Sequence, residues 1–391
     1  MAITDKKTGP WGLDQVYNKI NQGSIWEYSG QFELWTWGGG NWGQTGQNNN
    51  TKYSSPVQVP GTTWSKLSTT KEYNTIAIKT DGTLWMWGIN NLGQLGQNGG
   101  PALSSPKQVG TDTTWFDVDG GYRKTVATKT DGTLWAWGYG YQGGLAHGGS
   151  PGNTNRSSPI QIHGGGTTWT SPKTGGASGG STAALKTDGT LWTWGNNTDG
   201  ALGLNDTTNY SSPKQVPGTT WSSINISDTS PLMLATKTDG TLWVWGNNAD
   251  GQLGQNSRTQ YSSPKQIPGT TWASGDKQTT SGNNMSFAIK TDGTLWAMGD
   301  NTYGALGQNN RTGYSSPVQI PGTTWSKVHQ ASNNTLALKT DGTLWGWGDN
   351  RIGELSQNDA TPGYSSPVQI PGTGWDDISS SAYGQAAIKK L

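Results

Sequence analysis

One phrase, Lys-Thr-Asp-Gly-Thr-Leu-Trp-x-Trp-Gly, recurs along this chain of 391 residues and limits what it can fold into. Full or near copies place their leucines at Leu84, Leu134, Leu191, Leu242, Leu295 and Leu344. A degenerate copy at Phe32–Gly38 stands in front of them, so that successive leucines lie 50, 50, 57, 51, 53 and 49 residues apart. A fixed period of this length predicts a repeat architecture, either a solenoid or a propeller.

Each unit of the repeat reads as a set of short strands. Residues 75–79 alternate small or polar with apolar residues, and residues 83–87 return as a partner strand after Asp81-Gly82, a pair suited to a two-residue type I′ turn. Further along, a segment such as Tyr53–Pro60 contains proline, which confines it to a sheet edge or a strand end. We therefore expect about four strands and no helix in each unit.

The two chain ends decide between a solenoid and a propeller. The chain finishes at Ala386–Leu391, which matches the strand before the Asp-Gly turn, whereas the first unit begins with the partner strand Leu34–Trp37. Because a closed ring of sheets needs no capping unit, one blade is expected to form from both termini. The sequence predicts an all-β, seven-bladed β-propeller of four-stranded blades over residues 30–391, preceded by a segment of residues 1–29.

The composition excludes several classes of function. Lys and Arg number 26 against 25 Asp and Glu, so the basic excess typical of nucleic-acid binders is missing. No apolar run approaches 18 residues, so no membrane-inserted segment is expected, and the first residues lack the apolar stretch of a secretory signal. Twenty of the 23 Trp fall at repeat positions, leaving Trp11, Trp26 and Trp42, so we interpret the Trp array as packing between blades.

Catalytic and metal-binding patterns are missing from the sequence. His147, His163 and His329 have no ligand spacing around them, and no Gly-x-Ser-x-Gly motif occurs. The recurring aspartates, such as Asp81, are interpreted as turn residues whose charge is balanced by the lysine two positions earlier. We therefore expect no enzyme activity, no metal site and no cofactor.

Binding is the remaining class, and the repeats differ most in the segment before each inner hairpin and in the long third unit. Loops at equivalent places in a propeller emerge on one face, so these segments should form one variable rim. Aromatic and Arg residues are typical of binding hot spots. The candidate binding residues are Tyr122, Arg123, Tyr139, Tyr141 and Arg156. Simple loop variation on a tolerant surface is the alternative for each of them.

The pattern Gly-x-Leu-Trp-x-Trp-Gly-x-Asn-x-x-Gly-Gln-Leu-Gly, followed by a proline strand, resembles the regulator-of-chromosome-condensation repeat. The resemblance implies a seven-bladed propeller. Its members include a guanine-nucleotide exchange factor, a plant ultraviolet-B photoreceptor and secreted bacterial inhibitors of β-lactamase, so it does not choose a function. The photoreceptor's Gly-Trp-Arg-His-Thr motif is absent here, and the chain lacks the strongly charged loops that exchange factors need.

The segment of residues 1–29 resembles the leader of predicted virion proteins from phages of marine bacteria. Its apolar residues Leu13, Val16, Tyr17 and Ile20 follow the spacing of one helix stripe, with Trp11 in front of them. A helix this short needs a partner surface, so we expect an attachment segment that contacts other virion proteins. The expectation is a non-enzymatic structural or adhesive protein on a phage tail, fibre or capsid surface that binds a host protein or glycan. The alternative is a free bacterial binding module that inhibits or scaffolds another protein.

Overall fold

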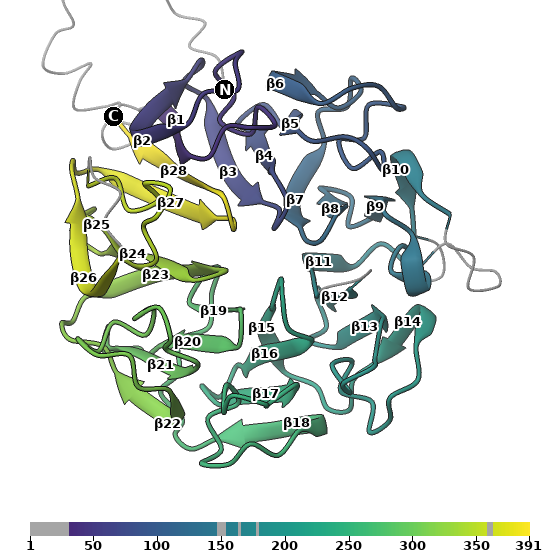
Figure 1. The fold of residues 1–391 in the computed structure, drawn as a ribbon. Helices are drawn as coiled ribbons and strands as arrows, with labels where there is room; N and C mark the ends of the chain where they lie inside the picture. The colour runs from purple at the N-terminus through teal and green to yellow at the C-terminus, as the bar shows by residue number, and fades with distance from the viewer. Residues whose placement is uncertain (1–30, 147–153, 163–165, 177–179, 358–362) are drawn as a thin grey trace, which may run out of the picture.

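The computed structural model describes residues 31–146, 154–162, 166–176, 180–357 and 363–391. These residues form seven four-stranded antiparallel sheets, arranged as blades around a central axis (Figure 1). The prediction of an all-β, seven-bladed propeller is confirmed. The attachment segment with Trp11, Leu13, Val16, Tyr17 and Ile20 lies outside the described residues, as do His147 and His163.

The first three blades follow one another along the chain. Blade 1 contains β3 (Trp64–Thr69), β4 (Asn74–Lys79), β5 (Leu84–Gly88) and β6 (Leu103–Gln108). Blade 2 contains β7 (Trp115–Gly120), β8 (Lys124–Lys129), β9 (Leu134–Gly138) and β10 (Arg156–Gln161). Blade 3 contains β11 (Trp169–Gly175), β12 (Ser181–Lys186), β13 (Leu191–Gly195) and β14 (Tyr210–Gln215).

The next three blades repeat this order. Blade 4 contains β15 (Trp221–Ile226), β16 (Leu232–Lys237), β17 (Leu242–Gly246) and β18 (Tyr261–Ile267). Blade 5 contains β19 (Thr279–Gly282), β20 (Met285–Ile289), β21 (Leu295–Gly299) and β22 (Tyr314–Gln319). Blade 6 contains β23 (Trp325–Ala331), β24 (Asn334–Lys339), β25 (Leu344–Gly348) and β26 (Tyr364–Ile370).

The closing blade joins the two ends of the chain. It contains β27 (Trp375–Ser380) and β28 (Gly384–Lys390) from the C-terminal end with β1 (Phe32–Gly38) and β2 (Tyr53–Val59) from the N-terminal end. Strand β28 pairs with β1 in unbroken register from Phe32 opposite Lys390 to Gly38 opposite Gly384. The predicted closure of the ring by both termini is therefore confirmed.

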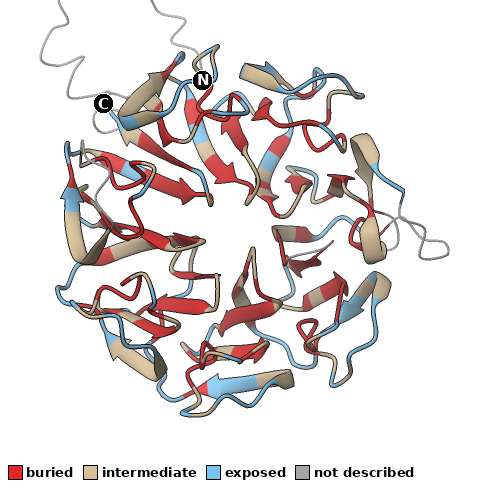
Figure 2. Ribbon diagram, viewed as in Figure 1, coloured by how far each residue is buried: buried red, intermediate tan, exposed pale blue. Residues whose placement is uncertain are grey.

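The inner strand of each blade faces the axis, and the outer strand forms the sheet edge on the outside of the ring (Figure 2). Proline-containing outer strands such as β2 and β6 are only partly buried, whereas β4 and β5 are almost fully buried. The predicted place of the proline strands at sheet edges is confirmed. A short 3-10 turn, η1 (Tyr141–Gly143), departs from the prediction that the units contain no helix.

The Asp-Gly turn differs from the predicted type I′ turn. A type I′ turn needs a positive φ at both central residues. Gly82 alone in this turn has a positive φ, 77°, and its N–H donates to Lys79 O at 2.9 Å. This is the three-residue loop in which a left-handed Gly follows a tight turn. Asp81 instead accepts hydrogen bonds from Thr83 N at 3.0 Å and Thr83 Oγ1 at 2.6 Å.

The lysine before each turn has a different role from the predicted balance of the aspartate charge. Lys79 Nζ lies 4.8 Å from the ring centroid of Trp64 and 4.1 Å from that of Trp85. The pKa of Asp81 is lowered chiefly by its hydrogen bond from Thr83, with Lys79 a smaller contributor. Because cations are attracted to indole faces, the repeated lysine serves mainly to cover the Trp pair.

The hydrophobic core is divided among the seven contacts between neighbouring blades. Each cluster joins buried residues of two adjacent blades, as where Trp347 of blade 6 packs with Phe287 and Ile320 of blade 5. Trp347 Nε1 also donates to Ala305 O of blade 5 at 2.7 Å. The interpretation of the Trp array as packing between blades is confirmed.

Candidate binding face

The predicted rim lies at one end of the blades. The loop between the first and second strands of a blade is hydrogen-bonded to the residue that follows the third strand. Examples are Ile89 N to Tyr73 O at 3.2 Å in blade 1 and Tyr139 N to Arg123 O at 2.9 Å in blade 2. The same contact joins Gly39 N to Tyr383 O at 2.6 Å in the closing blade. We call this end of the ring the loop face.

Four of the five candidate residues lie together on the loop face. The Arg123 guanidinium carbon lies 4.9 Å from the ring centroid of Tyr122, and the rings of Tyr139 and Tyr141 are stacked with centroids 5.7 Å apart. Arg156 lies at the start of the outer strand β10, opposite Gly138, and its Nε is buried without a hydrogen-bond partner. All five side chains are only partly exposed.

A row of three further aromatic residues lies beside the predicted patch. The ring of Tyr73 stacks on Tyr383 with centroids 4.6 Å apart and an interplanar angle of 16°, and Trp42 tilts against Tyr73 at 6.2 Å. Trp42 is 45% exposed and Tyr383 is 43% exposed. Tyr73 lies in the segment before an inner hairpin, where the sequence predicts the variable rim, and Trp42 was left outside the repeat. Nothing in the local sequence brings Tyr383 next to Tyr73.

An ion pair links the aromatic row to the predicted patch. Arg123 Nε of blade 2 donates to Glu72 Oε2 of blade 1, next to Tyr73. A hollow of about 380 Å³ lies between them, with Tyr73, Tyr122 and Tyr383 in its lining. The closing blade, blade 1 and blade 2 therefore present one continuous surface of aromatic and charged groups.

Two phenols of this surface, those of Tyr73 and Tyr122, have raised pKa values. Burial, a hydrogen bond with Tyr383 and the negative charges nearby raise the pKa of Tyr73 to about 12. Burial and the Glu72 carboxylate also raise the pKa of Tyr122. Neutral phenols donate and accept hydrogen bonds while burying a large apolar ring, which suits them to recognition.

Two residues of this surface have an unfavourable backbone conformation. Tyr73 and Arg123 have φ values of 54° and 57°, in the left-handed region. The equivalent loop of blade 5 has Asn at this place, Asn283 and Asn284, which tolerates that region better. Other non-Gly residues of the described chain, among them Thr220 and Thr324, have the same sign of φ, so the conformation follows from the loop geometry.

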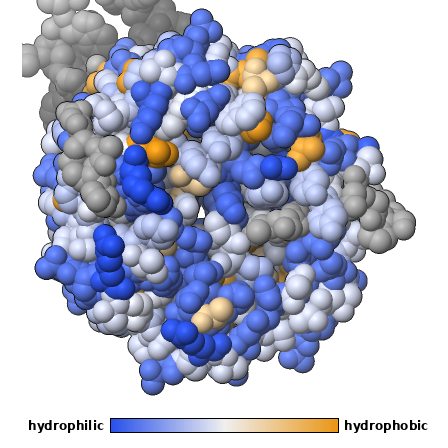
Figure 3. All heavy atoms as spheres, viewed as in Figure 1, coloured by the Kyte–Doolittle hydropathy of each residue, from blue (hydrophilic) through white to orange (hydrophobic). Residues whose placement is uncertain are grey.

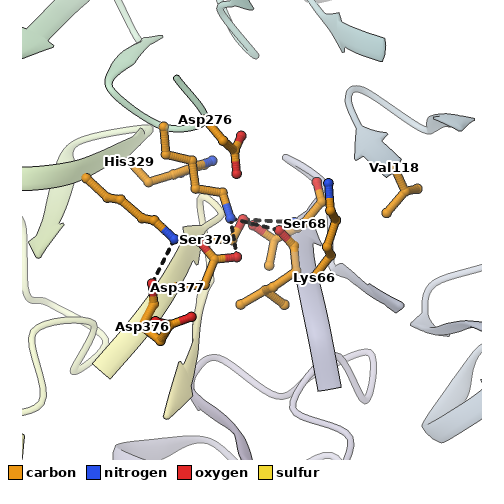
Figure 4. A network of polar contacts seen from close by, with 12 residues as sticks. Lys66, Ser68, Val118, Asp276, His329, Asp376, Asp377 and Ser379 are labelled. Atoms are coloured by element: carbon orange, nitrogen blue, oxygen red, sulfur yellow. Dashed lines mark hydrogen bonds and ion pairs between the residues drawn. The ribbon is translucent and has the colours of Figure 1, made fainter. Parts of the chain in front are cut away.

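The central channel contains a network of paired charges (Figure 4). Lys277 Nζ donates to Asp377 Oδ2 at 2.7 Å and to Leu67 O at 3.0 Å. Lys327 Nζ lies 3.2 Å from Asp377 Oδ1, and Lys66 Nζ lies 3.1 Å from Asp117 Oδ1.

The opposite side of the channel continues this pairing. Lys173 Nζ lies 3.6 Å from Asp119 Oδ1 and 3.7 Å from Asp276 Oδ1. Burial raises the pKa of Asp119 to about 6. The space enclosed is about 320 Å³. Because each lysine has an aspartate beside it, the channel offers little net field to an ionic ligand.

His329 and Ser380 also meet in the channel, without the geometry of a catalytic pair. His329 Nδ1 lies 3.1 Å from Ser380 Oγ and accepts a hydrogen bond from Ser380 N at 3.1 Å. Burial and the nearby lysines lower the pKa of His329 to about 3, so the imidazole is neutral. Ser380 is fully buried, so its hydroxyl has no access to a substrate.

The visible surface of the ring is largely polar. Figure 3 shows a face coloured mostly blue and white, with only separate orange residues.

Within the described ranges, no group of three or more His, Cys, Asp or Glu residues could hold a metal ion. The part of the chain that the structure describes contains no helix that is long and apolar enough to cross a membrane.

Comparison with known families supports the repeat. A model of the regulator of chromosome condensation (RCC1) repeat matches residues 81–128, 188–227, 239–289 and 292–338. A second model of the same repeat matches residues 277–305 and 332–353. Together they cover about half of the chain.

Curated relatives match over shorter stretches. The human E3 ubiquitin-protein ligase HERC2 is 28% identical over 143 residues, which are 35% of this chain and 3% of HERC2. The ultraviolet-B receptor UVR8 of Arabidopsis thaliana is 30% identical over 152 residues, which are 39% of this chain and 34% of the receptor. The match therefore spans only a minor part of either relative.

Solved structures match over nearly the whole chain. The crystal structure of human WBSCR16 has a TM-score of 0.79 at 18% identity and covers 92% of this chain and 99% of its own. Prp20p from Saccharomyces cerevisiae, whose structure was reported with its binding properties to Gsp1p and histones, has a TM-score of 0.78 at 16% identity. That match covers 93% of this chain and 92% of Prp20p. The chain belongs to the family of seven-bladed propellers built from regulator-of-chromosome-condensation repeats.

Proposed function

We propose that this protein is a non-enzymatic binding component of a phage particle, in which residues 1–29 attach the propeller to other virion proteins. The loop face then contacts a host protein or glycan. The observation that carries the binding role is the continuous surface from Trp42 through Tyr73 and Tyr383 to the Tyr122–Arg123 pair. The phage assignment rests on the resemblance of the first 29 residues to virion leaders.

The chemistry of the loop face favours a protein partner over a glycan. Trp, Tyr and Arg dominate binding hot spots between proteins. Tyr73 and Tyr383 stack on each other, so each has one ring face already covered. A sugar ring needs an open aromatic face on which to lie, whereas a protein loop can also use ring edges, the phenol groups and the Arg123–Glu72 ion pair. Binding of proteins also agrees with the reported binding of Prp20p to Gsp1p and histones.

Attachment is tested by comparing the full chain with residues 30–391, both tagged and produced in infected host cells. Quantitative mass spectrometry of purified particles should find the full chain and only traces of the shortened one. The shortened chain must keep the far-UV circular dichroism of the propeller for the comparison to be valid. Equal incorporation of both chains would contradict the attachment role and favour a free binding module.

Recognition is tested by the double substitution Tyr73→Ala and Tyr383→Ala. Particles that carry it should lose adsorption to host cells. Phe116→Ala is the matched control, because Phe116 is 50% exposed but lies at the opposite end of β7 from the loop face. Unchanged adsorption of the Tyr variant would refute the assigned surface. Binding of neutral glycans that only the Tyr variant loses would identify a sugar as the partner.

A further inference from the structure

One blade departs from the others at a single buried position. The second aromatic of the third strand is Trp in six blades, and Met298 takes its place in blade 5. In blade 4 the equivalent Trp245 is fully buried, its ring centroid lies 6.0 Å from that of Trp221, and its Nε1 donates to Ala201 O at 2.7 Å. The same indole contacts recur around Trp137 and Trp347.

Met298 replaces only the inner part of this indole. A Cβ added at Gly203 would lie 2.8 Å from Trp245 Nε1, and one added at the equivalent Gly254 would lie 2.6 Å from Met298 Sδ. The thioether sulfur therefore occupies the place that the pyrrole nitrogen holds in blade 4. Beyond the sulfur, methionine has a single methyl carbon, whereas the indole continues into a six-membered ring.

A cavity of about 310 Å³ lies beside this position, and it shares Gly254 and Pro317 with the surroundings of the Met298 sulfur. Its lining includes Gly254, Ile267 and Trp272. Their counterparts in other blades contact the indole: Gly96 and Val109 lie against Trp137, and Trp115 makes a ring contact with it. The cavity is therefore bordered by residues whose counterparts in other blades contact the buried indole.

The cavity has an apolar wall and a polar mouth. Trp272 and Trp296 meet edge to face at 6.5 Å and, with Pro317, provide flat apolar surfaces. Lys290 Nζ lies 4.2 Å from the centroid of Trp296, and Asn256 is also in the lining. Aromatic rings pack favourably edge to face, and a lysine ammonium pairs with an acceptor or a carboxylate.

We propose that this cavity between blades 4 and 5 binds one six-membered aromatic ring that carries a hydrogen-bond acceptor or carboxylate directed to Lys290. The ring takes the place of the missing indole half, between Trp272 and Ile267. Two sources share this chemistry, a free aromatic acid or alcohol and an aromatic side chain of a partner protein. The site lies between blades 4 and 5, whereas the proposed binding surface lies on the closing blade, blade 1 and blade 2, so the site does not depend on the function proposed for that surface.

The test uses isothermal titration calorimetry of the full chain with benzoate, benzyl alcohol, acetate and a blocked phenylalanine amide. We expect one equivalent of benzoate to bind and ringless acetate to give no heat. Met298→Trp restores the residue of the other six blades, so it should fold normally and weaken benzoate binding by at least about tenfold. Trp245→Met should open a second site and raise the stoichiometry to two.

Several outcomes would overturn the proposal. They are no binding of any aromatic probe to the unaltered chain, equal benzoate binding by Met298→Trp, and a stoichiometry that stays at one in a folded Trp245→Met protein. If Trp245→Met does not fold, benzoate binding by Met298→Trp alone decides whether the proposal holds. Binding of the phenylalanine amide as tightly as benzoate would identify a protein side chain as the source, and preference for benzoate would identify a free small molecule.

Discussion

Replacing Trp347 with Ala tests whether the Trp array stabilises the ring. Trp347 is fully buried in β25, its ring centroid lies 5.9 Å from that of Trp325, and its Nε1 donates to Ala305 O. Truncating a buried Trp to Ala costs about 3–5 kcal/mol. Thr335 Oγ1 also donates to Ala305 O, at 3.1 Å, so the carbonyl keeps one donor and the lost hydrogen bond adds only about 1 kcal/mol. We expect the free energy of unfolding to fall by about 4–6 kcal/mol.

Two further variants serve as controls for the effect of Trp347→Ala on the free energy of unfolding. Met298→Ala alters the equivalent position of blade 5, where no indole hydrogen bond exists to lose, and should cost about 2–5 kcal/mol. Trp42→Ala removes a half-exposed Trp and should cost about 1 kcal/mol or less. Urea unfolding followed by far-UV and near-UV circular dichroism measures all three, provided the two probes coincide. If Trp347→Ala costs no more than Trp42→Ala, the array does not hold the blades together.

Three other substitutions test the closure, a turn and the channel. Ala387→Asp places a charge in buried β28 opposite Trp35 and should lower the free energy of unfolding by at least about 3 kcal/mol, measured by urea titration. Asp341→Ala removes the acceptor of two hydrogen bonds from Thr343 and should lower the midpoint of urea unfolding in the same assay. Because burial lowers the pKa of His329 to about 3, only the unfolded chain takes up its proton near pH 6.5, so stability falls as the pH drops from 6.5 towards 3. Over that range the wild type should lose up to about 1.4 kcal/mol per pH unit more than His329→Gln, and parallel stability curves would contradict this.

The architecture could be predicted because each blade carries its own copy of the same sequence pattern. The Leu-Trp spacing gave the number of blades, and the matching halves of the repeat at the two ends predicted the closure that β1 and β28 make. The turn was assigned to the wrong class because Asp-Gly suits both a two-residue and a three-residue loop. The lysine was paired with the aspartate because sequence distance alone does not reveal the indole faces beside it.

The candidate site was only partly predictable. Tyr122, Arg123, Tyr139 and Tyr141 come from one unit, so irregularity of that unit was enough to group them. Tyr383 and Tyr73 are stacked although 310 residues separate them in the chain, and only the closed ring brings them together. The paired charges of the channel were missed for the same reason, because each blade contributes a single inner strand to it.

The sequence by itself determined the fold, because a phrase repeated seven times requires the same local structure in each unit, with the same buried indole in six of them. It also marked Met298 as the one departure from the second Trp. Only the tertiary structure decided what those residues do. Ring closure places Tyr383 on Tyr73, converts the lysines into covers for Trp pairs, and turns a missing indole into a cavity between two blades.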